Sequence, residues 1–134
     1  MKYGNLIFTQ RDLELMQLVL LNWNNSSELS EANFKLLSTE LKHVKVYPED
    51  EIPKDVVRFG SFIDIDTPIG LLTGYEIVVP VKRDPSQKKL SVLSPIGSAV
   101  IGYAEGDEVN WNFPLGQRVI KIKKVVNNLS ISAL

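Results

Sequence analysis

Residues 91–111 read SVLSPIGSAVIGYAEGDEVNW, and this stretch decides the fold. It begins with the alternation of a strand, after which Ser94 and Pro95 predict the start of a helix. Serine is a preferred N-cap, and proline fits the first helical position because that position needs no backbone N–H. Gly102 stands where a helix C-terminus needs a residue with positive φ. The Gly-Asp pair at 106–107 then predicts a turn into another strand.

Strand-like alternation of apolar residues continues on both sides of this stretch. The expected strands are residues 57–65 (with an irregularity at 60–61), 73–81, 90–93, 107–113 and 117–126. Most of their connections are too short for helical crossovers, which favours a mainly antiparallel sheet with one short helix before its fourth strand.

Two helical patterns precede the strands, within residues 1–47. Thr9 is the expected N-cap of the first helix, with Asp12 in its first turn, and Ser27 or Ser30 caps the second. Each helix carries an apolar seam with spacings of three, four and three residues: Leu13, Met16, Leu20 and Trp23, then Phe34, Leu37, Leu41 and Val44. Matching seams joined by a short polar loop predict an antiparallel helical hairpin, a short coiled coil. The hairpin either projects from the rest of the protein, which is the arrangement that we favour, or packs both helices on the sheet.

An acidic, proline-flanked connector at residues 48–54 follows the helical hairpin. Beyond it, in residues 55–134, the apolar period changes from that of a helix to that of a strand. Helices followed by a mainly antiparallel sheet define an α+β protein.

The composition excludes several classes of function. The 134-residue chain has a formal net charge of −1, so it lacks the excess of Lys and Arg on which strong direct binding of nucleic acid depends. It contains no cysteine, which excludes a disulfide framework and a cysteine zinc site, and its one histidine, His43, makes no metal cluster. No apolar run reaches the roughly 18 residues that span a bilayer, so we expect a soluble, cytoplasmic protein without a membrane partner.

Several short strings share their order and spacing with a known family. They are the run YEIVVP at 75–80, the run LSVLSPIGSA at 90–99, Gly102, the Gly-Asp pair at 106–107, Trp111 and the run PLG at 114–116. Together they resemble the C-terminal domain of the GreA/GreB transcript cleavage factors, and are most similar to the short-armed members of the Rnk type. The resemblance implies an FKBP-like domain and RNA polymerase as the partner, with docking at the rim of the polymerase secondary channel.

The same resemblance makes Ser94, Pro95, Ile96 and Gly97 candidate contacts with the polymerase, where Gly97 permits a close backbone approach. Ser94 and Pro95 are equally well explained as the start of a helix, so the residues by themselves leave both roles open.

The cleavage-active members of the family carry a long coiled coil whose tip presents acidic residues to a catalytic Mg²⁺. Two helices of about 15 residues extend only about 22 Å, at 1.5 Å per residue. Glu28 and Glu31 are the acidic residues at the expected tip, but a first-turn acid is also favoured by the helix dipole. We therefore expect no metal site, no cofactor and no small-molecule substrate. The expected function is that of a non-enzymatic regulator that competes with longer channel factors.

Two other functions stay open from the sequence. Glu28 or Glu31 as metal ligands would make the protein a stimulator of transcript cleavage. An FKBP-like peptidyl-prolyl isomerase would need an aromatic pocket, for which the candidates are Phe59, Phe62, Tyr75, Tyr103, Trp111 and Phe113. Lys121 and Lys123 lie on the solvent face of the last expected strand, where they either meet an acidic partner or protect a sheet edge.

Overall fold

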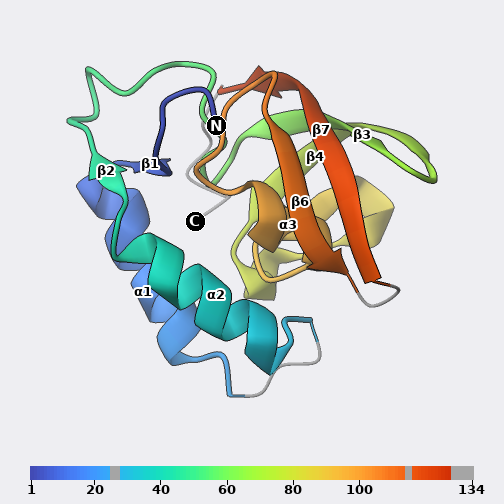
Figure 1. Ribbon diagram of the computed structural model, residues 1–134, viewed down its shortest axis with the longest axis horizontal. Coiled ribbons are helices and arrows are strands. Elements are labelled where there is room, and N and C mark those ends of the chain that lie inside the picture. Colours follow the sequence, from blue (N-terminus) through green and yellow to red (C-terminus); the bar gives the residue numbers. More distant parts are fainter. Residues whose placement is uncertain (25–27, 114–115, 128–134) are drawn as a thin grey trace.

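The computed structural model describes residues 1–24, 28–113 and 116–127, apart from the side chain of Phe113. Two helices come first, and a curled sheet with one short helix follows them (Figure 1). The elements are β1 (Ile7–Phe8), α1 (Gln10–Leu21), α2 (Glu31–Leu41), β2 (Lys45–Val46), β3 (Phe62–Thr67), β4 (Gly70–Val78), β5 (Lys89–Ser91), α3 (Pro95–Val100), β6 (Glu108–Phe113) and β7 (Gly116–Val126). This arrangement confirms the α+β class.

The two N-terminal helices begin at capping residues that the sequence predicts. The Thr9 hydroxyl accepts a hydrogen bond from the backbone N–H of Asp12 at 3.1 Å, and the Ser30 hydroxyl accepts one from Asn33 at 3.1 Å. Of the two expected caps for α2, Ser30 is therefore the one observed, and Ser27 lies outside the described residues. The helices run in opposite directions (Figure 1) and have 12 and 11 residues, so both are shorter than the expected fifteen.

The main sheet has five strands in the order β5-β4-β3-β7-β6. Its pairs are antiparallel, as expected, with the exception of β4 and β5, which run parallel. The exception arises in the connection between them, where two 3₁₀ turns, Pro80–Lys82 and Pro85–Gln87, return the chain without an α-helix, so that β5 lies alongside residues 76–78 at the end of β4.

The first strand of this sheet begins later than its apolar pattern predicts. Residues 56–61 are all buried, and they form a bent segment before β3, with Gly60 at a φ of +88°. The alternation that suggested a strand therefore does not mark one exposed and one buried face. The irregularity expected at 60–61 is observed as this bend at Gly60, and a second one lies further along, where the register between β3 and β4 shifts between Ile63 and Ile65.

The helical hairpin packs on the sheet and does not project from it. Its seam residues Met16, Leu20, Leu37 and Leu41 are buried in the same apolar core as residues of the sheet such as Ile65 and Trp111. Of the two arrangements left open by the sequence, the packed one is observed, since burial of the seams against the sheet removes more apolar surface from water.

A two-stranded parallel sheet at the base of the hairpin was not predicted. β1 precedes α1, β2 follows α2, and Ile7 pairs with Lys45. The backbone N–H of Ile7 also donates to the carbonyl of Gly102, at 3.0 Å, so β1 is joined to the end of α3. In the described parts of the chain, no helix is long and apolar enough to cross a membrane.

Gly102 ends α3 and provides a test of this junction. It has a φ of +82°, and a Cβ atom built on it would stand 2.7 Å from the Phe8 ring. Gly106 has a similar φ of +91° with no atom within 4 Å of such a Cβ. We expect Gly106→Ala to cost about 1–2 kcal/mol of unfolding free energy from backbone strain alone. Gly102→Ala should cost at least about 1 kcal/mol more, because Phe8 must also move. Urea denaturation measures both, and equal losses would contradict the close packing of Phe8 on Gly102.

Candidate functional site

The start of α3 is built as the sequence predicts. Ser94 is the N-cap, and its hydroxyl accepts a hydrogen bond from the backbone N–H of Gly97 at 3.0 Å. Pro95 occupies the first helical position, where its missing N–H leaves no intrahelical bond unmade. Ser94, Pro95 and Ile96 are each half-buried, so each keeps an edge at the surface. Ile96 also packs against the apolar core.

Gly97 has an internal role. It is buried, and a Cβ atom at this position would lie 2.2 Å from the backbone oxygen of Ser91. The close backbone approach that Gly97 permits is thus between α3 and the end of β5 within the same chain. A surface contact at this motif would be made by Ser94, Pro95 and Ile96.

The two acidic candidates near the hairpin tip both have basic partners. Glu28 forms an ion pair with Arg83, which lies between the two 3₁₀ turns after β4. Glu31 is exposed and pairs with Lys35, one turn further along α2, at 3.4 Å. Among the residues that the structure describes, no three acidic or histidine side chains come together as a metal site.

A buried ion pair that sequence reasoning missed joins α1 to the segment before β3. The Nε of Arg58 donates to Oδ2 of Asp12 at 2.6 Å, and the two side chains are only 6% and 4% exposed. The Nη2 of Arg58 donates to Oε1 of Glu49 in the connector, at 2.8 Å. Burial by itself lowers the pKa of Arg58, but the hydrogen bonds and charges of Asp12 and Glu49 outweigh it, so the net direction of the pKa is upward. Arg58 is therefore a permanent cation.

The segment that carries Arg58 is held in place by a second set of polar contacts. The Ser61 hydroxyl accepts from the backbone N–H of Arg58 at 2.7 Å and is itself hydrogen-bonded to the Asn127 side chain. The Asn127 amide also donates to the carbonyls of Lys54 and Val56, at 2.8 and 2.7 Å. These bonds join residues 54–61 to the end of β7.

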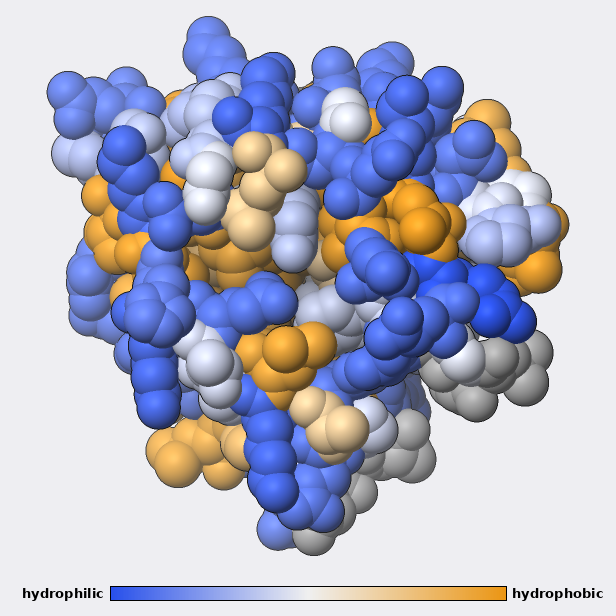
Figure 2. Space-filling model, in the orientation of Figure 1, coloured by the Kyte–Doolittle hydropathy of each residue, from blue (hydrophilic) through white to orange (hydrophobic). Residues whose placement is uncertain are grey.

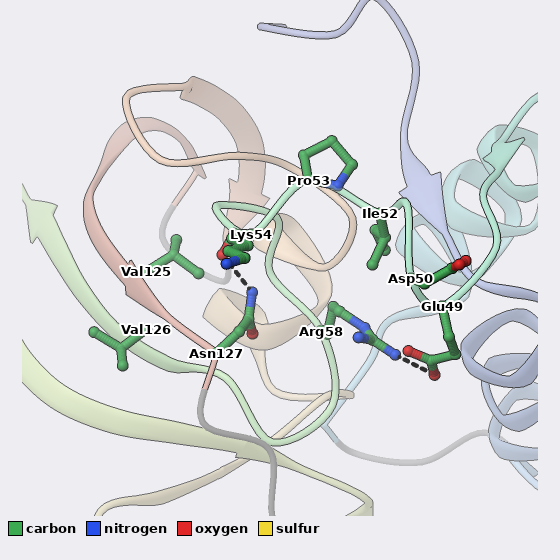
Figure 3. Close-up of a pocket in the computed structure, with 9 residues that line it drawn as sticks. All are labelled: Glu49, Asp50, Ile52, Pro53, Lys54, Arg58, Val125, Val126 and Asn127. Carbon is green, nitrogen blue, oxygen red and sulfur yellow. Dashed lines mark hydrogen bonds and ion pairs between the residues drawn. The ribbon is translucent and has the colours of Figure 1, made fainter.

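A pocket of about 600 Å³ opens beside this network. Figure 3 shows Arg58 turned toward Glu49 and Asn127 turned toward the backbone of Lys54. The lining residues are Glu49, Asp50, Ile52, Pro53, Lys54, Arg58, Val125, Val126 and Asn127. Of the six aromatic candidates for an isomerase, Phe113 has a side chain outside the described part of the structure, and none of the other five lines the pocket. Two of them, Phe59 and Trp111, are buried in the core.

The lysines of β7 face carboxylates on both neighbouring strands. Lys121 pairs in register with Asp66 of β3 and Glu108 of β6, and Lys124 pairs with Asp64. Lys123 is exposed, as expected. Since opposite charges stand across the strands, this surface is far less positive than its lysines alone suggest.

Apolar residues are exposed elsewhere on the molecule. Figure 2 shows several apolar patches on one face, among them one at the tip of the β3–β4 hairpin, on the right, and one at the far end of α1, at the lower left. The exposed apolar residues of these two regions include Ile69 and Leu71, and Leu18 and Leu21.

Taken together, these features describe an α+β protein with a short helical hairpin bound to a β-rich body. The family model described as "Transcription elongation factor, GreA/GreB, C-term" matches residues 52–127. The chain therefore belongs to the GreA/GreB family of transcription elongation factors, as the sequence motifs indicated.

Two relatives show the extent of the match. The chain is 35% identical over 95 residues to the transcription elongation factor GreA of Desulfovibrio desulfuricans, which is 70% of this chain and 59% of the relative. It is 39% identical over 100 residues to GreA of Acetivibrio thermocellus, covering 74% of this chain and 62% of the relative. The match thus spans about three-fifths of the length of these relatives.

A solved structure of the family has the same architecture. The GreA/GreB factor from Nitrosomonas europaea superposes with a TM-score of 0.70 at 28% identity, and the alignment covers 92% of this chain and 98% of that one. Unlike the relatives matched in sequence, it is matched along almost its whole length.

The packing of Gly97 gives a prediction with a definite sign. In an ordinary helix, Gly→Ala stabilises by about 1 kcal/mol. Here the added methyl group would meet the backbone oxygen of Ser91, so we expect Gly97→Ala to destabilise the protein by about 1–3 kcal/mol. Thermal unfolding by circular dichroism measures the change. A stabilised variant would contradict the close contact between α3 and β5.

Proposed function

We propose that this protein binds RNA polymerase at the rim of its secondary channel and regulates transcription without stimulating transcript cleavage, as a short-armed, Rnk-like member of its family. The body docks through the exposed edges of Ser94, Pro95 and Ile96, and the protein competes with longer channel factors for this place. Family membership supports the choice of partner. The observation that carries the absence of cleavage activity is the short hairpin, with its acidic residue turned back onto the body.

The length of the helices limits what the hairpin can reach. The 12 residues of α1 extend about 18 Å at 1.5 Å per residue. The hairpin lies against the body along its apolar seams, so little of this length is available to enter a channel.

The surroundings of the acidic residues near the tip also support the absence of cleavage activity. A Mg²⁺ site needs carboxylate oxygens that are open to the ion. Glu28 is instead paired with Arg83, and its side chain is only 17% exposed. Glu31 is 68% exposed and its surface ion pair with Lys35 is weak, but no third acidic or histidine side chain of the described residues joins the two as a metal site. We therefore propose that neither residue is a metal ligand and that the protein is not an enzyme.

The proposed docking surface predicts the effect of one substitution. Pro95→Ala removes an exposed ring edge at a helix position that tolerates alanine, so the fold should persist. We expect a loss of affinity for core RNA polymerase of at least about fivefold, as for a contact near the centre of an interface. Binding is measured by fluorescence anisotropy with a dye on a single introduced cysteine.

Ile69→Ala is the matched control, because Ile69 is apolar, is 94% exposed, and lies at the tip of the β3–β4 hairpin, away from α3 (Figure 1). It should bind as the wild type does. Equal affinities of all three proteins would rule out the α3 surface, and a wild-type protein that does not bind would rule out the partner.

Transcript cleavage in stalled elongation complexes tests the second part of the proposal. A GreA of full length serves as the positive control. We expect no stimulation by the wild type and no change in Glu28→Ala or Glu31→Ala, because the short hairpin lies against the body and Glu28 is paired with Arg83. Stimulation by the wild type that is lost in Glu28→Ala would show that the protein is a cleavage factor.

A further inference from the structure

Three polar contacts connect the helical arm, defined as α1, α2 and the described residues between them, to the body, defined as residues 55–113 and 116–127. At the base, Asp12 pairs with Arg58. Along α2, the Asn33 amide donates to the backbone oxygen of Asn112 in β6, at 2.7 Å. Near the tip, Glu28 pairs with Arg83.

The contact at the base differs from the other two in its burial. Asp12 and Arg58 are both at least nine-tenths buried, whereas the Arg83 side chain is 58% exposed. Exposed ion pairs are screened by water and contribute little. Removal of one partner of a buried pair strongly destabilises a protein, because the remaining charge has neither water nor a counter-ion beside it.

The two members of the buried pair are each fixed to their own part of the molecule. Asp12 stands in the first turn of α1, and its backbone N–H donates to the hydroxyl of the Thr9 cap, three residues earlier. Arg58 belongs to the segment that Ser61 and Asn127 join to the end of β7. A guanidinium offers its donors in a fixed plane, so its bonds to Asp12 and Glu49 specify direction as well as distance.

The apolar seams do not specify direction in this way. Burial of apolar surface is largely non-directional, and apolar cores tolerate repacking that loses the uniqueness of an arrangement before it loses stability. We propose that the Asp12–Arg58 pair is the positioning contact that sets the single orientation of the arm on the body. The same contact also determines where the arm lies when Ser94, Pro95 and Ile96 dock on the polymerase, a consequence that rests on the proposed function.

The absence of cysteine from the chain makes the orientation directly measurable. Leu21→Cys at the end of α1 and Ile69→Cys in the body introduce two labelling sites that are 80% and 94% exposed. Spin labels at these two sites report the arm–body distance of the free protein by pulsed electron paramagnetic resonance. We expect one narrow distance distribution in the otherwise unchanged chain.

The decisive variant replaces both charges with apolar side chains, Asp12→Leu together with Arg58→Met. Removal of a whole buried ion pair is often neutral for stability, so this variant should fold with an unchanged or higher midpoint of unfolding. Its distance distribution should nevertheless become at least about twofold wider or gain a second peak. Arg58→Lys keeps the positive charge but loses the planar set of guanidinium donors, so the width of its distance distribution should lie between those of the labelled parent and the double variant. This variant provides the test if the double variant does not fold.

Lys35→Ala is the matched control, because it removes an exposed ion pair within α2 and none between arm and body. Its distribution should equal that of the labelled parent. A distribution that stays narrow in the double variant, or in Arg58→Lys if only that variant folds, would overturn the proposal and show that apolar packing orients the arm.

The same labelled proteins separate this inference from the proposed function. The distances are measured without polymerase, so they stand whether or not the protein binds it. If the wild type binds core RNA polymerase, the double variant should still bind within about threefold, since the α3 surface is untouched, and only its ability to displace a full-length GreA should fall.

Discussion

The junction between the helical arm and the body is organised around one buried cation, Arg58. Arg58 carries its charge into the interior, where water cannot solvate it, and the protein must supply the counter-charges. Asp12 and Glu49 do so from two segments that precede Arg58 in the chain. The two hydrogen bonds bring the start of α1, the acidic connector and the segment before β3 together at one guanidinium. The β1–β2 pair and the packing of Phe8 on Gly102 close the same junction from the other side.

The helical arm is consequently packed against the body and shares its apolar core. A long coiled coil can extend because its helices bury their seams against each other alone. In this protein the seams of α1 and α2 are shared with the core beneath the sheet, and extension of the arm would expose them. The acidic residue nearest the tip is likewise bound to the body through Arg83. This packed arm is the basis of our proposal that the protein occupies a surface of the polymerase and does not carry carboxylates to a distant metal ion.

The start of α3 shows how one short motif satisfies several structural needs at once. Ser94 caps the helix, Pro95 supplies the fixed φ of its first position, and Gly97 allows the helix to approach β5. These roles account for the order of the residues without any partner. They also make the surface edge of the motif rigid, and rigid apolar edges lose little conformational entropy on binding. The proposed polymerase contact therefore uses a surface that the fold already holds in place.

The sequence by itself determined the features that depend on neighbours along the chain. The caps at Thr9 and Ser94, the positive φ of Gly102, the turn before β4 and the family motifs were all readable, because each involves residues only a few positions apart. Only the tertiary structure decided the parallel pairing of β5 with β4, the unexpected β1–β2 pair and the packed position of the arm. It also turned Asp12, an ordinary first-turn acid by its sequence, into the partner of a residue 46 positions away. Pairings between residues so far apart along the chain are determined by which groups are buried together in the folded protein. The periodicity of apolar residues along the sequence does not specify which groups these are.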